Sequence, residues 1–245
     1  MIKKLLSRLR GTAKQDRIRH KFPEITDDEV AIISRYRELT MTGLERQWAL
    51  IGALRYLNRG GIAGDVVECG VWRGGNMMMA RHLGRQSGVE RDYYLFDTFT
   101  GMSEPTKEDV SHHGEAASVT FEQKQRPDHV DWCYASLEDV RANFSAAGLL
   151  DERVKFIKGK VEDTLRVEAN VPKQIALLRL DTDFYESTRI ELEVLYPRLV
   201  KGGVLIIDDY GYWKGAQQAV DEYFRDRNVL LMRIDRDARI TIKQQ

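Results

Sequence analysis

Short apolar runs alternate with longer amphipathic segments along most of the chain, and this alternation predicts strands and helices in turn. The expected strands occupy residues 65–68, 93–97, 154–157, 175–183, 204–207, 229–232 and 239–242. The expected helices occupy residues 30–39, 44–58, 76–85, 136–147, 186–199 and 216–225. Strands that alternate with helices build an α/β fold, in which helices cover both faces of a parallel sheet. The last two strands are separated by a short turn, 235–237, and should form a hairpin, so we expect seven mostly parallel strands.

The regular pattern fails between residues 98 and 130, where glycines, prolines and polar residues interrupt it. Structureless segments of this length are uncommon in compact domains and usually act as lids or binding loops. We therefore predict that residues 98–130 form a lid that covers an active site and shapes the choice of substrate. His112 and His113, which lie in this segment, are candidates for a general base, although a histidine in such a loop is more often merely solvated.

Composition narrows the class of protein. The chain has 245 residues with 38 basic and 38 acidic side chains, so no net charge favours a nucleic acid partner. This length accommodates one domain, which we place at residues 26–245. Two cysteines provide no disulfide framework, and we expect Cys69 to be a small buried residue of the core. No apolar run is long enough to span a bilayer, and a cytoplasmic location is expected.

The N-terminal residues 1–25 differ from the rest of the chain in charge. Residues 1–21 hold eight of the basic side chains and one acidic one, which leaves 30 basic and 37 acidic residues elsewhere. The apolar residues Met1, Ile2, Leu5, Leu6 and Leu9 could share one face of a helix. A basic amphipathic segment can contact a membrane surface. We favour a solvated tail or one that contacts another subunit of a homo-oligomer.

The strongest local motif runs from Glu68 to Gly75, where an apolar strand ends in a carboxylate and a glycine-rich turn leads into a helix. Open parallel sheets build nucleotide sites at such turns. Gly70 can take backbone angles that a side chain forbids, and we expect Gly74 and Gly75 to let a ligand approach the main chain. The dinucleotide pattern G-x-G-x-x-G is absent, because Val71 occupies the position of its second glycine. The spacing instead resembles motif I of S-adenosylmethionine-dependent methyltransferases, and a purely structural turn is the alternative.

Further polar residues follow the next strands. Asp97 ends the second strand, 29 residues beyond Glu68, where a carboxylate can accept both ribose hydroxyls of a nucleoside or cap the following turn. Glu162 and Asp163 follow the third strand, and either could meet an adenine amino group or serve as a helix N-cap. Thr42 precedes a helix and could border the same ligand or belong to a plain loop.

Aspartates gather at the ends of the fourth and fifth strands. Asp181 and Asp183 end one strand, and Asp208 and Asp209 end the other, so all four should reach the same edge of the sheet. Such carboxylates repel one another unless a cation or proton is bound. Oxygen ligands without nearby cysteine or histidine suit Mg²⁺ or another divalent cation of that kind. The alternative is that these acids cap helices or pair with arginines, for which Arg179 and Arg189 are available.

Four motifs together resemble the macrocin O-methyltransferase (TylF/MycF/NovP) family over roughly residues 40–228. The motifs are GDVVECGVWRGG at 64–75, FDTFTGM at 96–102, LDTDFYEST at 180–188 and GGVLIIDDYG at 202–211. The resemblance implies a class I, Rossmann-like methyltransferase fold, S-adenosyl-L-methionine as methyl donor, a divalent metal and a sugar hydroxyl as acceptor. Members act on deoxysugars of macrolide and aminocoumarin glycosides, and related proteins occur in polysaccharide gene contexts. The acceptor is therefore expected to be a small molecule or a glycan.

Carried onto this chain, the resemblance makes Asp181, Asp208 and Asp209 the metal ligands, with Asp181 also the general base and the histidines of the lid behind it. The cofactor site is expected to comprise Glu68, Gly70, Val71, Trp72, Gly74, Asp97, Thr98, Glu162, Asp163 and Thr42. A catechol-type small-molecule O-methyltransferase and a non-catalytic cofactor-binding scaffold remain as alternatives. A nicotinamide oxidoreductase would require the dinucleotide glycine pattern that the turn lacks.

Overall fold

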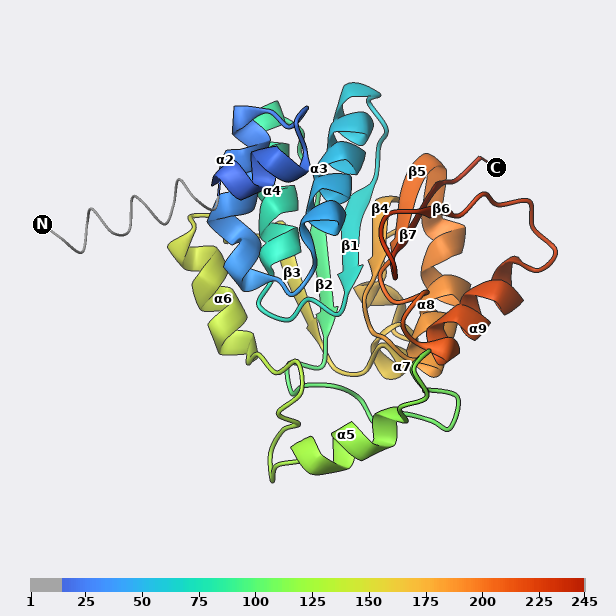
Figure 1. Cartoon of the computed structure of the whole chain (residues 1–245). Helices are drawn as coiled ribbons and strands as arrows, with labels where there is room; N and C mark the ends of the chain where they lie inside the picture. Colours follow the sequence, from blue (N-terminus) through green and yellow to red (C-terminus); the bar gives the residue numbers. More distant parts are fainter. Residues whose placement is uncertain (1–14, 245) are drawn as a thin grey trace, which may run out of the picture.

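The computed structural model describes residues 15–244, and a seven-stranded sheet runs through its centre in the order β3-β2-β1-β4-β5-β7-β6 (Figure 1). The strands are β1 (Asp65–Cys69), β2 (Tyr93–Asp97), β3 (Val154–Lys158), β4 (Ile175–Leu180), β5 (Leu199–Ile207), β6 (Met232–Arg233) and β7 (Arg239–Ile242). Pairs from β3 across to β5 are parallel, whereas β7 runs antiparallel to both of its neighbours. The predicted seven-stranded, mostly parallel sheet with a terminal hairpin is confirmed.

Helices cover both faces of the sheet (Figure 1), and the central strand β4 is accordingly buried along its whole length. The helices are α2 (Asp27–Tyr36), α3 (Leu44–Arg59), α4 (Gly75–Ser87), α5 (Ala117–Lys124), α6 (Leu137–Ala146), α7 (Val161–Thr164), α8 (Tyr185–Leu195) and α9 (Lys214–Phe224). Single 3₁₀ turns are η1 (Arg37–Leu39), η2 (Glu168–Asn170) and η3 (Tyr196–Arg198). Successive strand residues point to opposite faces, so Val66 belongs to the core that includes residues of α2, α3, α4 and α6, while Val67 belongs to the core that includes residues of α7, α8 and α9. Cys69 is buried in the second of these layers, as expected.

The packed region extends further toward the N-terminus than the predicted domain boundary at residue 26. Residues 15–21 are helical, and Ile18 and Phe22 are buried in the same core as α2. The ring of Phe22 lies 4.7 Å from that of Trp48 on α3. The amphipathic pattern predicted for Met1 to Leu9 lies outside the described residues. Within the part of the chain that the structure describes, no helix is long and apolar enough to cross a membrane.

Two local predictions were wrong: no helix was expected in the segment 98–130, and a strand was expected at 229–232. The segment 98–130 contains the helix α5, whose buried Ala117 and Phe121 are one turn apart and offer too few apolar positions to set a visible period. Only Met232 of the strand predicted at 229–232 belongs to β6. Val229 and Leu231 instead pack beside α8 and α9, while Leu230 is exposed. An apolar run at the edge of a sheet can therefore be used for packing without being paired as a strand.

Candidate active site

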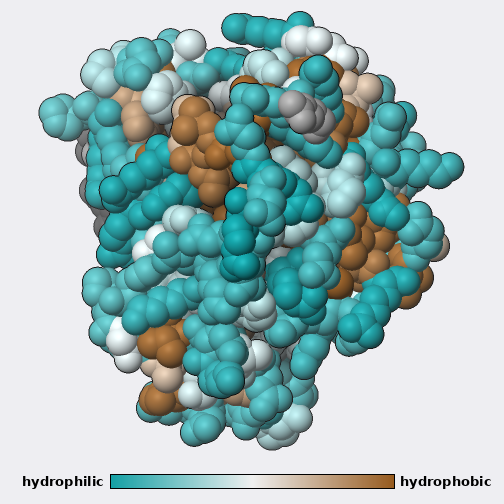
Figure 2. All heavy atoms as spheres, turned by 90° about the vertical axis from the view of Figure 1, so that its right-hand side faces the viewer, coloured by the Kyte–Doolittle hydropathy of each residue, from teal (hydrophilic) through white to brown (hydrophobic). Residues whose placement is uncertain are grey.

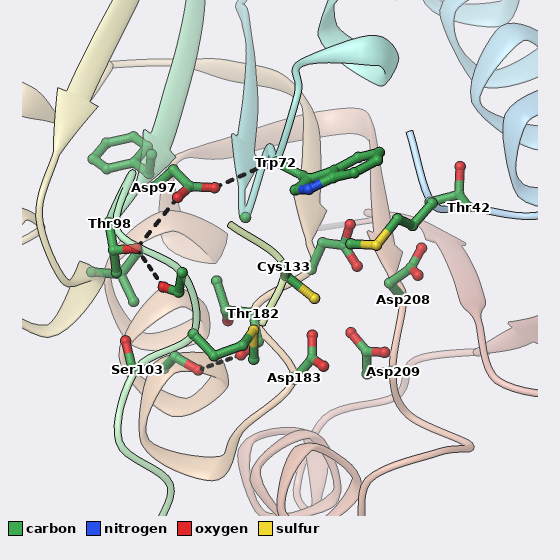
Figure 3. Close-up of a pocket in the computed structure, with 18 of the residues that line it drawn as sticks. Thr42, Trp72, Asp97, Thr98, Ser103, Cys133, Thr182, Asp183, Asp208 and Asp209 are labelled. Atoms are coloured by element: carbon green, nitrogen blue, oxygen red, sulfur yellow. Dashed lines mark hydrogen bonds between the residues drawn. The ribbon is translucent and has the colours of Figure 1, made fainter. Parts of the chain in front are cut away.

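A pocket opens at the carboxyl end of the sheet, beside the point between β1 and β4 where the strand order reverses (Figure 3). Its empty volume is about 930 Å³, including the part open to solvent. Crossovers on either side of such a point leave in opposite directions and create a crevice for a ligand. The predicted site residues that line the pocket are Thr42, Gly70, Trp72, Asp97, Thr98, Asp181, Asp208 and Asp209. The predicted site residues that do not line it are Glu68, Val71, Gly74, Glu162 and Asp163.

The glycines of the turn after β1 make room for the protein itself. Gly70 has a φ of 80°, and a Cβ there would lie 2.0 Å from the carbonyl oxygen of Asp181, so only glycine lets the ends of β1 and β4 approach. A Cβ on Gly74 would lie 2.7 Å from the ring of Phe144 on α6. A Cβ on Gly75 would lie 2.6 Å from the backbone at the end of η1. We expected Gly74 and Gly75 to let a ligand approach the main chain. In the structure they instead let α6 and the end of η1 pack closely against the turn.

Asp97 shapes the same turn from the neighbouring strand. Its Oδ2 accepts hydrogen bonds from the backbone N–H groups of Val71 at 2.8 Å and Trp72 at 3.1 Å, and its Oδ1 accepts one from Phe99 at 2.7 Å. Burial raises the pKa of Asp97, and these backbone donors oppose the shift. The carboxylate thus holds the backbone of the turn while facing the pocket (Figure 3). Val71 contributes its N–H group to this arrangement and no pocket surface.

Glu68 lies behind the pocket wall, which corrects its predicted place in the lining. Its side chain is 1% exposed, and Oε1 accepts hydrogen bonds from Asn76 Nδ2 at 2.9 Å and from Arg179 Nη1 at 2.7 Å. The Thr42 hydroxyl donates to Asn76 Oδ1 at 3.3 Å, which connects Glu68 to a residue of the pocket surface. Glu68 can therefore act on a ligand only by fixing the residues in front of it.

The turn after β3 contributes other residues than predicted. Glu162 and Asp163 lie in the first turn of α7, and the N-cap position of that helix is occupied by Lys160, so neither acid is the cap. Gly159 and Val161, on either side of the cap, line the pocket. The sequence located the correct turn, but the N-cap lies two or three residues before the predicted ones, and this shift changes which side chains face inward.

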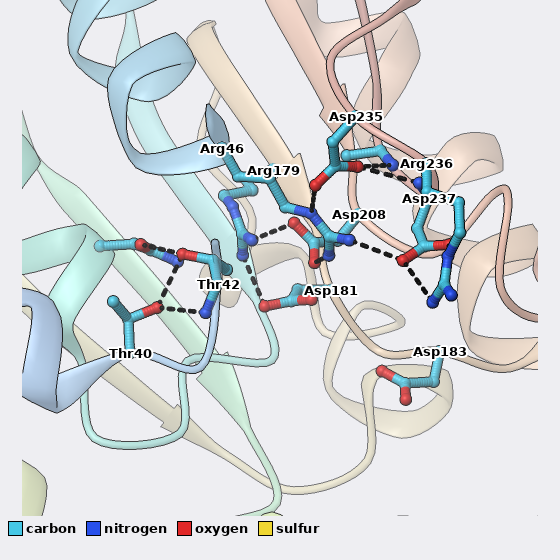
Figure 4. A network of polar contacts seen from close by, with 12 residues as sticks. Thr40, Thr42, Arg46, Arg179, Asp181, Asp183, Asp208, Asp235, Arg236 and Asp237 are labelled. Carbon is cyan, nitrogen blue, oxygen red and sulfur yellow. Dashed lines mark hydrogen bonds and ion pairs between the residues drawn. The ribbon is translucent and has the colours of Figure 1, made fainter. Parts of the chain in front are cut away.

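Four aspartates from two strand ends form the other side of the pocket, and we refer to Asp181, Asp183, Asp208 and Asp209 as the acid cluster. Figure 3 labels the last three, and Figure 4 labels Asp181. Asp181, Asp208 and Asp209 each offer one carboxylate oxygen, and these three atoms lie within 4.8 Å of one another. The remaining member, Asp183, accepts a hydrogen bond from Trp213 Nε1 at 3.0 Å. The prediction that the aspartates after β4 and β5 meet at one edge of the sheet is confirmed.

Two guanidinium groups contact the acid cluster (Figure 4). Arg179, from the interior of β4, donates to Asp181 Oδ2 at 2.6 Å and to Asp208 Oδ1. Arg46, from α3, donates to Asp208 Oδ2. Arg46 was not identified from the sequence, since it is 162 residues from Asp208 and has no motif around it. Arg189, the other predicted partner, pairs on the surface with glutamates of its own helix.

Burial and mutual repulsion raise the pKa values of the acid cluster. Burial raises the pKa of Asp208 to about 7, and Asp181 adds to the shift while Arg179 and Arg46 oppose it. Burial also raises the pKa of Asp183 to about 6. The pKa of Asp209 is raised well above its ordinary value by burial and then by its three aspartate neighbours. Raised pKa values of this kind mean that a proton or a cation would stabilise the acid cluster.

The acid cluster fits a divalent cation. Asp209 Oδ2 is buried and has no hydrogen-bond partner among residues 15–244, so one oxygen of the three-aspartate group lacks the compensation that burial demands. The donors are all carboxylate oxygens, which are the ligands that Mg²⁺ prefers, and neither histidine nor thiolate is among them. Cys133 does line the pocket, but burial and the nearby aspartates keep the thiol protonated at neutral pH by raising its pKa.

The segment 98–130 contributes to the pocket through its beginning, where Gly101 and Met102 join the lining. His112 and His113 are exposed and do not line the pocket. The middle of the segment is held against the body of the protein, because Asp109 Oδ1 accepts the N–H of Tyr185 at the start of α8 at 2.8 Å. The placement of the two histidines therefore gives no support to their candidacy as a base.

Backbone strain is concentrated around the pocket. Among the described residues, the non-glycine residues with positive φ are Trp72, Phe99, Cys133 and Asp183. Three of these line the pocket, and the fourth donates its N–H to Asp97. Such conformations cost about 1–3 kcal/mol each and persist where the surrounding structure imposes them, often at functional sites. The sequence offered little signal for them, because only Asp183 is of a residue type that is enriched at positive φ.

Comparison with known proteins identifies relatives of this chain. Residues 5–240 match the family model described as macrocin-O-methyltransferase (TylF). The chain is 38% identical over 186 residues to the 8-demethyl-8-(2,3-dimethoxy-alpha-L-rhamnosyl)-tetracenomycin-C 4'-O-methyltransferase of Streptomyces olivaceus, which covers 75% of this chain and 67% of that protein. It is 36% identical over 201 residues to the mycinamicin III 3''-O-methyltransferase of Micromonospora griseorubida, with 80% and 75% covered.

Solved structures agree with the sequence matches. The O-methyltransferase NovP superposes with a TM-score of 0.73 at 32% identity, over 84% of this chain and 83% of that one. The calicheamicin methyltransferase CalS11 superposes with a TM-score of 0.61 at 19% identity, over 94% and 91% of the two chains, and shows the fold alone. The predicted class I methyltransferase fold is confirmed.

Proposed function

This chain belongs to the TylF macrocin O-methyltransferase family, and we propose that it methylates a sugar hydroxyl of a glycoside or polysaccharide with the help of a divalent cation. It is an S-adenosylmethionine-dependent O-methyltransferase, as its relatives indicate. A sugar acceptor is supported by the tetracenomycin relative, whose name specifies a rhamnosyl substrate. The metal requirement is supported by the acid cluster and the unpartnered oxygen of Asp209.

The observation that carries the proposal is that one pocket joins a nucleoside-type end to an acidic end. Trp72 and Asp97 face the pocket from the ends of β1 and β2, respectively. Asp181 and Asp208 face it from the ends of β4 and β5. Methyl transfer from a sulfonium is an in-line displacement, so donor and acceptor must lie in one enclosure. We assign the first end to the cofactor and the second to the acceptor.

The reaction places a specific demand on Asp181. As the acceptor oxygen forms a bond to the methyl carbon, the carbon–sulfur bond breaks, S-adenosylhomocysteine leaves and the hydroxyl proton must be taken up. Asp181 is the proposed proton acceptor, because Arg179 donates to its Oδ2 and holds the carboxylate in place. Asp181, Asp208 and Asp209 are the proposed ligands of the cation. When bound there, a divalent cation would orient the acceptor and lower the pKa of its hydroxyl.

Calorimetric titration tests the cofactor half of the proposal. We expect the purified protein to bind S-adenosylhomocysteine and to give no heat with NAD⁺. Turnover is then measured with S-adenosylmethionine and two acceptor sets, rhamnosides and catechols, in Mg²⁺ and in EDTA. Methylation of a rhamnoside that EDTA abolishes is the expected result. Methylation of catechols alone would identify a catechol-type enzyme, and equal activity in EDTA would refute the metal requirement.

A further inference from the structure

The turn between β6 and β7 lies at the edge of the sheet. Its two aspartates, Asp235 and Asp237, bind Arg46, which lines the pocket (Figure 4). Arg46 Nε donates to Asp235 Oδ2 at 2.7 Å, and its Nη2 donates to Asp237 Oδ2 at 3.0 Å. Its remaining terminal nitrogen, Nη1, donates to Asp208 Oδ2. The Arg46 side chain is 14% exposed and lines the pocket, so all three bonds form in a partly desolvated place.

The turn holds Arg46 in a defined position. Asp235 Oδ1 accepts the backbone N–H groups of Asp237 at 2.9 Å and Ala238 at 2.8 Å, which fixes that carboxylate within the turn. A guanidinium group is planar and rigid, so three engaged nitrogens determine both its place and its orientation. Because its nitrogens already contact three carboxylates, Arg46 is poorly suited to bind an anionic acceptor. Its partners indicate a role toward Asp208 instead.

Asp208 is consequently held from two sides. Arg179 donates to its Oδ1 and Arg46 to its Oδ2, so neither oxygen can rotate away without breaking an ion pair. Across residues 15–244, these two arginines are the cations that form ion pairs with the acid cluster. Arg46 therefore combines a geometric function with a share of the charge balance.

We propose that Arg46, Asp235 and Asp237 are positioning residues of the methyl-transfer site. The two turn aspartates hold Arg46, and Arg46 orients Asp208 while placing one positive charge beside the acid cluster. The cation-binding part of this inference rests on the proposed function. The residues involved come from α3 and from the last hairpin, outside the four motifs that identify the family.

The two roles of Arg46 predict changes of opposite sign when its charge is removed. Loss of the orienting bonds should lower kcat, because a misplaced ligand or base costs transition-state stabilisation. Loss of one positive charge near three carboxylates should strengthen the binding of a divalent cation, because like charges repel strongly at short range in a partly buried site. A side chain that merely supports the fold would weaken both properties together.

The first experiment measures cation binding without turnover, by calorimetric titration of the protein with MnCl₂ in the presence of S-adenosylhomocysteine at pH 8. We expect Arg46→Gln to bind Mn²⁺ at least about threefold more tightly than the wild type, since one charge is removed. Arg46→Lys keeps the charge and should stay within about twofold. Arg55→Gln is the matched control, because Arg55 lies on the same helix and pairs with Glu29, away from the pocket.

The second experiment is a double-mutant cycle on kcat. We expect Arg46→Gln to lower kcat about 30-fold or more and Arg46→Lys about 10-fold, the range typical of lost positioning. Asp235→Asn should lower kcat about threefold to tenfold in the wild type and should add nothing in the Arg46→Gln background, because Asp235 acts through Arg46. Thermal unfolding confirms that each variant is folded, and Arg46→Lys serves if Arg46→Gln is not.

Weaker Mn²⁺ binding by folded Arg46→Gln would overturn the charge role, and an additive effect of Asp235→Asn would overturn the positioning role. A wild type that binds S-adenosylhomocysteine but no divalent cation would refute the metal part of the proposed function. In that case the kcat cycle alone decides the positioning role, so the two failures are distinguishable.

Discussion

Acids follow strands in both halves of the pocket, at the end of β2 and at the ends of β4 and β5, but their surroundings differ. Asp97, at the end of β2, accepts three backbone N–H bonds, so its charge is compensated by the protein main chain. Asp209, after β5, has a buried oxygen that accepts no hydrogen bond from the described part of the chain, and it lies among other aspartates. The charge of the first acid is compensated by the main chain, whereas the second is one of the ligands that we propose for a divalent cation.

This difference shows that an acid at a strand end has no fixed role of its own. In the half that we assign to the cofactor, three backbone N–H groups converge on the carboxylate of Asp97. In the acidic half, Arg46 and Arg179 compensate only part of the charge, which favours a cation or protons. The pattern along the chain is the same in both halves, and the neighbours supplied by the fold decide which function results.

The largest expected effect that separates the halves comes from Asp181→Asn. This variant keeps the size of the side chain but removes a proton acceptor and a cation ligand, so kcat should fall by about 10³-fold or more. Affinity for S-adenosylhomocysteine should change by less than about twofold, since β1 and β2 are untouched. Steady-state kinetics and calorimetry on the same preparation provide both values. Retention of full activity would remove Asp181 from both of its proposed roles.

Asp97→Asn is the complementary change in the cofactor half. An amide nitrogen would face one of the backbone N–H groups that the carboxylate now accepts, and the negative charge that we assign to ribose binding would be lost. Hydrogen bonds to a charged group contribute about 1.5–3 kcal/mol, so affinity for S-adenosylhomocysteine should fall about 10-fold to 100-fold. Mn²⁺ affinity should remain near the wild-type value. If cation binding fell as much as cofactor binding, the two halves would not be independent.

The sequence predicted the framework of this site well, because the framework depends on local patterns. Apolar strands that end in acids located Asp97, Asp181 and Asp208 on one rim, and the structure places all three in the pocket. The glycine-rich turn was also located, but the purpose of Gly74 was not, because its close neighbour is a phenylalanine on α6 that is distant in sequence. Patterns along the chain identify elements and say little about what each element meets.

What the sequence could not predict depends on contacts between distant segments. Arg46 resembled any other arginine of an amphipathic helix until the fold brought it to Asp208 and the last hairpin. Glu68 lies near the end of β1, which runs one residue further, to Cys69, than predicted, and Arg179 and Asn76 hold its side chain behind the pocket wall. Motif spacing assigns residues to a rim, whereas the rotation of a side chain toward or away from the ligand is decided by such partners.

The pH dependence of folding stability is a smaller expected effect, and it arises from the acidic half of the pocket. Because burial raises the pKa of Asp208 to about 7 in the folded protein, the folded state without metal binds this proton more tightly than the unfolded state does. Stability in EDTA should therefore decrease as the pH rises from about 5 toward 7.5, and Mg²⁺ should restore it at pH 8. Urea unfolding measures both. Asp208→Asn should show a shallower decrease, and an identical slope in that variant would assign the pH dependence to other groups.

The smallest expected effect concerns the arginine that the sequence offered as an alternative partner for the acids. Arg189 is 38% exposed and pairs with Glu186 and Glu193 along one face of α8, where water screens the charges. Exposed pairs of this kind contribute about 0–1 kcal/mol, so Arg189→Gln should change the free energy of unfolding by less than about 1 kcal/mol. Cofactor affinity and kcat should be unchanged. Arg179, which is 3% exposed and contacts three carboxylates, differs in burial and in partners, although both residues are arginines beside acids. A loss of activity in Arg189→Gln would mean that the exposed surface of α8 influences the acid cluster. The residues that affect catalysis would then extend beyond the pocket lining.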